Sequence, residues 1–429
     1  MKALLVTHGT RGDVQPMLAL AVALREAGHH ALLAAPASFA PAARDNGVEF
    51  AALDEGPNRL MDDPVVRRAV DGGYRGLRGK ITALRTAGRI KPLMADVLRD
   101  LGPVARASGA DVVVHTPSVP AQHVAELLGV PAVLATFQPG WVPTSAFPCP
   151  MVPLPRLPRF LNRTTYLTVS ATLRAFAGIV EKWRVRDLGL PRRKGEHDLL
   201  HGPDGRDRWV LQAFSPAASP VAPDWPASVH TTGFWYLPSG PWTPPARLSE
   251  FLAAGPPPVY VGFGSMAGRD AERTGRTVVD AVRAAGVRAV LATGWGGIDA
   301  AASPDVLVID QAPHDWLFPR MAAVVHHGGG GTTAAALAAG VPQVVCPFVA
   351  DQPYWASRMH ALGVAPRPVR QQRLDADTLA AAITTALTLR SRAADVAHVV
   401  RAEPGTGEAV RLLEELLEPR LSTMDQSAV

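Results

Sequence analysis

The first third of the chain alternates between short apolar runs, glycine-containing turns and helical patterns. Residues 3–7 form an apolar run, a turn with two glycines follows, and apolar positions then recur with helical spacing over 14–27. A strand buried on both faces reads as a continuous apolar run, so this unit predicts the start of a parallel α/β sheet. Further strands of the same kind are predicted at 29–35, 111–115 and 131–136.

The same alternation restarts in the second half of the chain. Strands are predicted there at 259–263, 289–293, 306–310, 323–326 and 343–346. The proline density of residues 139–158 excludes helix and sheet interiors and predicts a long apolar loop. A second proline-rich stretch, before residue 259, predicts a linker between two α/β domains.

These boundaries define the predicted domain organisation. The parts are a first α/β domain at 1–215, a linker at 216–257, a second α/β domain at 258–407, and a helix and tail at 408–429. Open parallel sheets bind ligands beyond the carboxyl ends of their strands. Two such sheets facing each other predict a binding cleft between the domains, and the last helix could pack back on the first domain.

Composition and charge narrow the class of protein. With 47% hydrophobic and 19% charged residues, the chain predicts a packed core rather than disorder. The net charge of +5 suits an anionic small ligand and is too small to predict nucleic-acid binding. The two cysteines exclude a disulfide framework and a cysteine zinc site. Because no apolar run approaches the roughly 18 residues that span a bilayer, and no signal-peptide core is evident, we expect a cytoplasmic protein.

The strongest chemical signal is a glycine block between a predicted strand and a predicted helix. His327 is followed by four glycines at 328–331 and by Thr332 and Thr333. Glycines allow a ligand to approach the backbone, and a helix start offers free N–H groups and a positive dipole end, an arrangement that suits a diphosphate. The alternative is a simple capped turn, which leaves the entropy cost of four consecutive glycines unexplained.

Other predicted strand ends carry polar side chains that have two interpretations each. Asp13 could act as a general base or could cap the helix that follows it, and His8 is a second, more structural candidate. Ser265 could hold a phosphate oxygen or serve only its turn. Asp351 and Gln352 could bind vicinal hydroxyls or cap the next helix. Kinase-type, dinucleotide-binding and esterase glycine motifs are absent from the sequence.

Together these pieces resemble the family 1 glycosyltransferases of GT-B fold, especially the bacterial antibiotic-type enzymes and the sterol glucosyltransferases. The likeness rests on residues 10–16, 258–266 and 311–363, and it is weakest over 54–100 and 139–206. It implies two Rossmann-like domains facing across a cleft, the first binding the acceptor and the second the donor. It also implies inverting transfer of a hexose from a nucleotide sugar, such as UDP-glucose or a dTDP-sugar, to an acceptor hydroxyl.

The resemblance implies a role for each matching position. Asp13 would be the catalytic base, and Asp351 and Gln352 would bind the donor sugar. The residues implied at the donor diphosphate are Arg11, Ser265, His327, Gly329, Gly330, Gly331 and Thr332. Those implied at the nucleoside are Trp295, Gln311, Ala312 and His314. No metal ion and no cofactor beyond the nucleotide-sugar co-substrate is expected.

The acceptor side is predicted from the long apolar loop. Trp141, Phe147 and Met151 could form a wall for an apolar aglycone, or the loop could be a surface lid or connector. Several basic residues could touch a membrane surface or an acidic acceptor, although such residues are more often a solvated face; they are Arg156, Arg159, Arg163, Arg192, Arg193 and Lys194. The alternative functions are a sterol or lipid glucosyltransferase at a membrane surface, a sugar-nucleotide epimerase, and a homologue that only binds nucleotide sugar. The expected partners are small molecules, without nucleic acid and with at most peripheral membrane contact.

Overall fold

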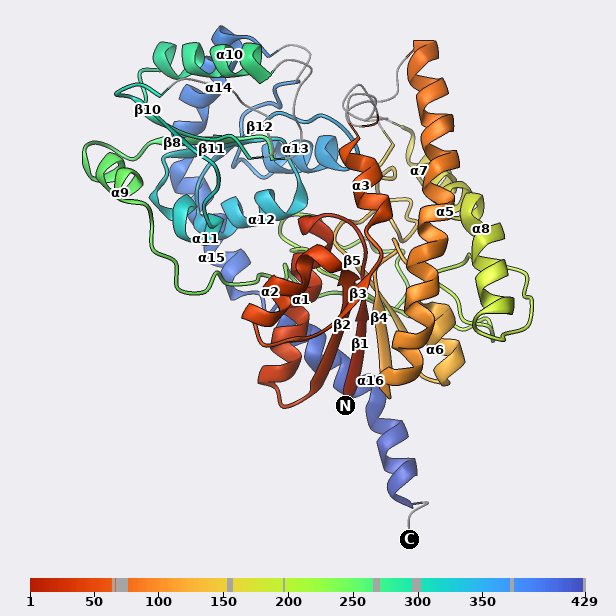
Figure 1. The fold of residues 1–429 in the computed structure, drawn as a ribbon. Helices are drawn as coiled ribbons and strands as arrows, with labels where there is room; N and C mark the ends of the chain where they lie inside the picture. Colours follow the sequence, from red (N-terminus) through yellow and green to blue (C-terminus); the bar gives the residue numbers. More distant parts are fainter. Residues whose placement is uncertain are drawn as a thin grey trace.

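The computed structural model consists of two α/β domains, each built on one parallel sheet (Figure 1). The first domain is drawn in red, orange and yellow, and the second in teal and blue. This architecture confirms the fold class that the sequence predicts. The structure describes residues 1–63, 66, 76–152, 157–195, 197–264, 271–294, 302–370 and 374–426.

The first sheet has seven strands in the order β3-β2-β1-β4-β5-β6-β7, and all neighbouring strands are parallel. The strands are β1 (Lys2–Val6), β2 (His30–Pro36), β3 (Glu49–Leu53), β4 (Val112–His115), β5 (Ala132–Thr136), β6 (Trp209–Gln212) and β7 (Val229–Thr231). Side chains alternate along a strand, so neighbouring residues of β1 enter different cores. Leu5 packs with residues of α1 (Arg11–Glu26), whereas Leu4 packs with residues of α5 (Gly76–Ser108).

Further helices complete the first domain. They are α2 (Ala40–Asp45), α3 (Gly56–Asp62), α6 (Gln122–Leu128), α7 (Arg159–Thr165) and α8 (Leu167–Arg186), with a short 3-10 turn at Ala37–Phe39. Helices α5 and α8 lie side by side over the face opposite α1 (Figure 1). The sequence pattern did not predict α7 and α8, because few residues of α8 are fully buried and its apolar stripe is therefore weak.

The second sheet has five parallel strands in the order β10-β9-β8-β11-β12. The strands are β8 (Val259–Gly262), β9 (Ala289–Ala292), β10 (Val306–Ile309), β11 (Ala323–His326) and β12 (Gln343–Val345). The helices of this domain are α9 (Ala246–Ala253), α10 (Ala271–Ala284), α11 (His314–Leu317), α12 (Gly330–Ala339), α13 (Gln352–Ala361), α14 (Ala376–Leu387) and α15 (Arg390–Ala402), with a 3-10 turn at Phe318–Arg320. All five strands lie within two residues of their predicted positions.

The proline-rich stretch at 216–257 differs from the linker that the sequence predicts. Strand β7, which lies within it, pairs with β6 and completes the first sheet. Helix α9 packs through Leu248 into the second domain. A three-residue strand close to prolines carries no readable alternation, which explains why the sequence pattern missed it.

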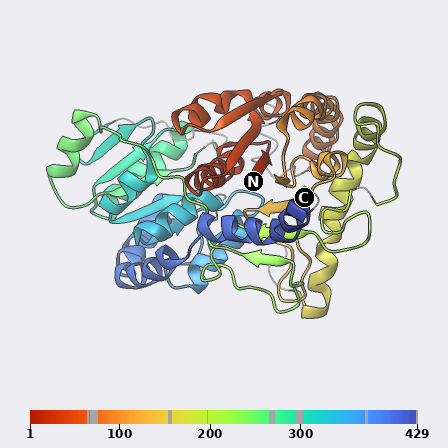
Figure 2. The same ribbon diagram turned by 90° about the horizontal axis from the view of Figure 1, so that it is seen from below.

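The last helix, α16 (Thr406–Gln426), leaves the second domain and lies against the first, as Figures 1 and 2 show. Leu413 is fully buried in the core that also contains α1. At the surface, Glu414 lies 2.7 Å from the imidazole of His29. The chain therefore connects the domains twice, once before β8 and once through α16. None of the described helices combines the length and apolar composition needed to cross a membrane.

Candidate active site

The candidate site lies where the strand order of each sheet reverses. This reversal falls between β1 and β4 in the first sheet and between β8 and β11 in the second. Ligands of open parallel sheets bind at such switch points, beyond the carboxyl ends of the strands. Asp13 follows β1 and the glycine block follows β11, so both predicted groups occupy these positions.

Asp13 serves as a cap for α1 and also presents its carboxylate between the domains. Its Oδ2 accepts hydrogen bonds from the backbone N–H of Thr10 at 2.8 Å and from the Thr10 hydroxyl at 3.3 Å. Gly9 has a φ of 139°, and a Cβ there would lie 2.3 Å from the same oxygen, so the turn requires glycine. Burial raises the pKa of Asp13, and the bonds from Thr10 oppose that shift. The side chain of Asp13 is still partly exposed, so a ligand can reach its carboxylate although burial raises the pKa.

Asp351 lies across from Asp13 on the second domain. Its Oδ2 accepts a 2.9 Å hydrogen bond from the indole N–H of Trp355. Burial raises the pKa of Asp351 to about 6, the bond from Trp355 opposes the shift, and the negative charge of Asp13 adds to it. The preceding Ala350 has a left-handed φ of 57°, a strained conformation for a residue with a Cβ. The carboxylates of Asp13 and Asp351, one from each domain, therefore lie close enough for the charge of one to affect the other.

The raised pKa of Asp351 predicts a stability difference that depends on pH. A carboxyl whose pKa is higher in the folded state destabilises the fold once it ionises, so this cost develops as the pH rises from about 4 to about 6. Asp351→Asn keeps an acceptor for Trp355 and removes the charge. We expect the variant to match the wild type at pH 4 and to be more stable at pH 8, on the order of 1–2 kcal/mol. Thermal unfolding at both pH values checks this, and equal stability at pH 8 would contradict the raised pKa.

The glycine block is held by a buried histidine that the sequence pattern left unassigned. Nδ1 of His326 accepts the backbone N–H of Gly328 at 3.1 Å, so its proton must reside on Nε2. Nε2 accordingly donates to Oε1 of Gln343 at 2.8 Å. Burial lowers the pKa of His326 to about 3, which keeps this tautomer neutral. Gly328 has a φ of 91°, and a Cβ there would lie 2.8 Å from Val345, so only glycine fits.

His327 lies against two glycines of neighbouring turns. A Cβ on Gly329 would lie 2.5 Å from Nε2 of His327, and a Cβ on Gly264 would lie 3.4 Å from Cε1. The ring therefore occupies space that a side chain at position 329 would take, and it lies at contact distance from position 264. Burial lowers the pKa of His327 to about 4, so the ring is neutral near pH 7 and carries one N–H donor. Its Nδ1 is buried and has no hydrogen-bond partner within the described residues.

Helix α12 begins immediately after this ring and faces the first domain. Gly329 is its N-cap and supplies no side-chain cap, so the first-turn N–H groups stay available to a ligand. These groups belong to Gly330, Gly331 and Thr332. A Cβ on Gly330 would lie 3.5 Å from the Trp355 indole nitrogen and 3.8 Å from the carbonyl of Phe137 in the first domain. The turn can therefore bind an anion between the two domains.

Gln352 has a structural contact as well as its predicted place beside Asp351. Its Oε1 accepts backbone N–H bonds from Phe348 at 2.8 Å and from Val349 at 3.2 Å. These bonds hold the turn that presents Asp351. Only the side-chain N–H groups of Gln352 are left to contact a sugar, because an amide oxygen with two donors is satisfied.

Arg11 and His314 approach each other from opposite domains. Burial raises the pKa of Tyr260 to about 12 and lowers that of His314, and the positive charge of Arg11 acts on both groups in the lowering direction. Burial brings the pKa of His314 to about 4, and its ring stacks on Phe318 with centroids 4.2 Å apart. Nε of Arg11 donates to Gln15 at 2.9 Å, so the rest of the guanidinium can turn toward the second domain.

The positions of the other predicted site residues say less about their function. Gln311 is exposed just after β10, and Ala312 is half-buried beside it. Ser265 and Trp295 lie outside the described residues. His8 is buried, and its Nε2 contacts the backbone carbonyl of Asp54 at 2.9 Å, which favours the structural interpretation of this side chain. Within the described residues, no group of three or more His, Cys, Asp or Glu side chains is placed to hold a metal ion.

Of the three residues predicted as an acceptor wall, the structure places two in one cluster and the third at the domain boundary. Trp141 and Met151 are half-buried and pack inside the first domain. Phe147 instead lies at the domain boundary, between Trp225 of the first domain and Tyr354 of α13, with ring centroids 6.0 Å and 5.9 Å away. Phe147 is therefore the member of this group that can contact a ligand between the domains.

Several residues of the site were missed by the sequence analysis. Trp355 holds Asp351, and Tyr354 and Arg358 lie on the same helix. The spacing of Asp351, Tyr354 and Arg358 places them on one helical face, a signal that was readable once α13 was assigned. His326 was readable only as a strand end, because its partners Gly328 and Gln343 are joined by folding.

Comparisons with known proteins agree with this architecture. The family model described as Glycosyltransferase family 28 N-terminal domain matches residues 3–147, and that described as Erythromycin biosynthesis protein CIII-like, C-terminal domain, matches residues 289–416. O-mycaminosyltylonolide 6-deoxyallosyltransferase of Streptomyces fradiae is 34% identical over 450 residues, covering 98% of this chain and 98% of that relative. The crystal structure of the glycotransferase of kitacinnamycin has a TM-score of 0.69 at 22% identity, covering 97% of this chain and 98% of that chain.

Sterol glucosyltransferases are also among the relatives. Sterol 3-beta-glucosyltransferase of Emericella nidulans is 34% identical over 97% of this chain, and this chain spans only 30% of that enzyme's length. The fold and the site thus define a glycosyltransferase of GT-B fold. The chain belongs to the family 1 type of these enzymes, which includes antibiotic sugar transferases and sterol glucosyltransferases.

Proposed function

We propose that this protein transfers a hexose from a nucleoside diphosphate sugar to a hydroxyl of an apolar small molecule, with inversion at the anomeric carbon. The observation that carries the proposal is that Trp355 contacts both Asp351 and the first turn of α12, while the charge of Asp13 on the first domain reaches Asp351. The acceptor class follows from the relative that acts on O-mycaminosyltylonolide and from the aromatic side chain of Phe147 at the boundary.

The proposed reaction begins at Asp13. The carboxylate takes the proton of the acceptor hydroxyl, and the acceptor oxygen forms a bond to the anomeric carbon. The bond from that carbon to the diphosphate oxygen breaks on the opposite face, and its electron pair leaves with the diphosphate. A pKa raised by burial makes Asp13 a stronger base than an exposed aspartate. Asp351 and the N–H groups of Gln352 hold the sugar hydroxyls that lie between the two carboxylates.

The second domain stabilises the leaving group. Negative charge on the departing diphosphate faces the first-turn N–H groups of α12 and the N–H of His327. These dipoles are fixed before the reaction, because His326 and its partners hold the turn. Preorganised donors of this kind stabilise a transition state more than mobile groups do. Arg11 can approach the same diphosphate from the first domain.

The donor is tested with a panel of UDP-, dTDP- and GDP-sugars. A ligand at about 100 times its Kd should stabilise the folded protein by about 2.7 kcal/mol, which thermal unfolding detects. Nucleotide release is then followed with and without a polyketide aglycone. Release that depends on the acceptor supports transfer, and equal release without it supports the epimerase alternative. Failure of every nucleotide sugar to stabilise the protein would reject the proposed function.

A second candidate function is glucosylation of a sterol or lipid at a membrane surface. On α7 and α8, Phe160 is 77% exposed and Leu167 is 65% exposed, and Arg159 lies beside Phe160. Exposed apolar side chains next to basic residues favour an anionic bilayer. Sedimentation with vesicles containing phosphatidylserine, compared between the wild type and Phe160→Ser/Leu167→Ser, tests this candidate. Equal sedimentation of the two proteins would reject it.

A further inference from the structure

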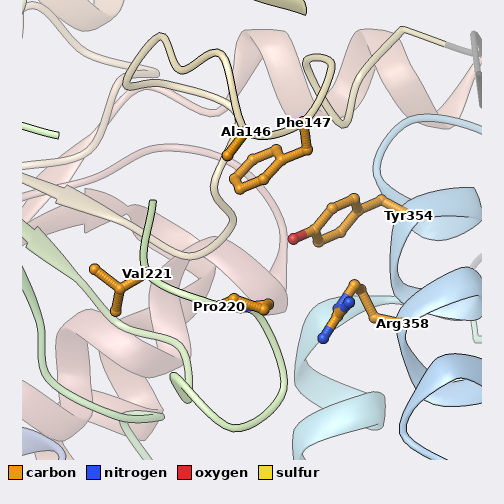
Figure 3. Close-up of a pocket in the computed structure, with 6 residues that line it drawn as sticks. All are labelled: Ala146, Phe147, Pro220, Val221, Tyr354 and Arg358. Carbon is orange, nitrogen blue, oxygen red and sulfur yellow. The ribbon is translucent and has the colours of Figure 1, made fainter. Parts of the chain in front are cut away.

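A small pocket lies between the domains along α13, beyond Asp351. Its volume is about 240 Å³, and it is partly open to solvent. The first domain contributes the loop that carries Phe147 and the segment around Val221, and the second domain contributes α13 (Figure 3). The lining residues are Ala146, Phe147, Pro220, Val221, Tyr354 and Arg358.

The walls of this pocket are fixed by contacts that need no ligand. The Tyr354 hydroxyl lies 2.6 Å from the hydroxyl of Ser219. Phe147 packs edge-to-face on Trp225, and Asp224 accepts the backbone N–H of Ser145 at 2.8 Å. Figure 3 shows the rings of Phe147 and Tyr354 next to each other on one side of the pocket. Because these side chains are already held in place, little conformational entropy is lost when a ligand binds in the pocket.

The pocket contains one guanidinium, that of Arg358, which forms no ion pair with any described carboxylate. Arg358 is half-buried, and its Nε donates to the carbonyl of Ala218 at 2.9 Å. In the described part of the chain, no carboxylate forms an ion pair with this guanidinium. Four of its five N–H donors are therefore left to water or to a ligand. A guanidinium among aromatic and apolar walls suits a planar carboxylate, which it can bind through two hydrogen bonds.

The two pocket residues of α13 lie on the same face of this helix as Asp351. Asp351, Tyr354 and Arg358 are spaced three and then four residues apart, so they lie on the same side of the helix. Seven residues of helix separate the sugar-binding Asp351 from Arg358, which corresponds to about 10 Å along the axis. A molecule that extends about 10 Å along this face from the sugar at Asp351 can therefore reach Arg358 with its far end.

We propose that this pocket is an acceptor subsite that binds a carboxylate, carried at the far end of a rigid apolar body about 10 Å long. Phe147 and Tyr354 contact the apolar body, and Arg358 binds the carboxylate. The proposal rests on the glycosyl transfer proposed above and narrows its acceptor class. A sterol has no anionic end and leaves Arg358 unpaired, so the subsite argues for an acidic acceptor instead.

The test compares two probes that differ only in charge. These are 4′-hydroxybiphenyl-4-carboxylate and its methyl ester, and calorimetry measures their binding to the protein saturated with the best nucleoside diphosphate of the panel, or to the free protein if none binds. We expect the wild type to bind the carboxylate at least about tenfold more tightly than the ester. Arg358→Gln should lose this preference, and Arg358→Lys should keep part of it. Equal binding of the two probes to the wild type, or no binding of either, overturns the subsite.

A matched control separates the local charge from a general loss of arginine. Arg392 also donates through Nε to a single backbone carbonyl, that of Leu362 at 3.0 Å, but it is exposed on α15. Arg392→Gln should keep the preference for the carboxylate, and its loss in this variant would overturn the assignment. Nucleotide binding to Arg358→Gln should equal that of the wild type. A carboxylate preference without any nucleotide binding would leave the subsite standing and reject the proposed function, whereas nucleotide binding without the preference would do the reverse.

Discussion

Asp13→Asn should lower the rate of sugar transfer by about a thousandfold while nucleotide affinity stays close to that of the wild type. General bases contribute roughly a factor of 100 to 10,000, and an amide cannot take the proton of the acceptor hydroxyl. The variant still accepts the Thr10 hydrogen bonds through its amide oxygen, so the start of α1 should be preserved. Initial-rate kinetics with the best donor of the panel, together with nucleotide titration, measure both quantities.

Asp13→Asn should also change the pKa of Asp351, the carboxyl group on the second domain. The charge of Asp13 contributes to the raised pKa of Asp351, so its removal should lower the pKa of Asp351 below about 6.

Asp375→Asn is the matched control, because Asp375 caps α14 through the N–H and hydroxyl of Thr378 and lies outside the site. We expect this control to transfer sugar at the wild-type rate. Transfer by Asp13→Asn within tenfold of the wild-type rate would contradict its role as base.

All strands of the second sheet and four strands of the first were predictable because they are short, continuous apolar runs, whereas β3, β6 and β7 were missed. Parallel strands are covered on both faces, so Leu4 and Leu5 are both apolar although they enter different cores. The glycine block was predictable for a related reason. A Cβ on Gly328 or Gly329 would lie too close to neighbouring side chains, so the fold restricts both positions to glycine. In such places the backbone geometry restricts the residue type directly, and a single sequence retains the signal.

The remaining parts of the site depend on contacts between distant segments. Phe147 is separated by more than two hundred residues from Tyr354, and nothing in the local pattern of the loop distinguishes it from Trp141 or Met151. The partner of Asp351 was closer in sequence, but Trp355 reads as an ordinary core residue of α13. Strand β7 was missed because three residues carry no periodicity, and its place comes from pairing with β6.

His327→Ala and Gly329→Ala should cause losses of similar size, because both remove the same donor from the diphosphate. One preorganised donor at a developing negative charge contributes about a hundredfold to a thousandfold in kcat. His327→Ala deletes the ring. Gly329→Ala places a Cβ 2.5 Å from Nε2 of His327 and forces the ring away from its position. We expect kcat to fall about a hundredfold in each variant, measured with saturating donor and acceptor.

The double variant distinguishes a shared cause from two separate ones. If Gly329→Ala acts by displacing the ring, it has nothing further to displace once His327 is alanine, so the double variant should be no slower than His327→Ala. Gly178→Ala is the control, since a Cβ at this exposed position of α8 meets no atom within 4 Å and should leave kcat unchanged. Losses that multiply in the double variant would show that His327 and the α12 backbone act independently. Because the pKa of His327 is about 4, the wild-type rate should also show no titration of this ring between about pH 6 and 8.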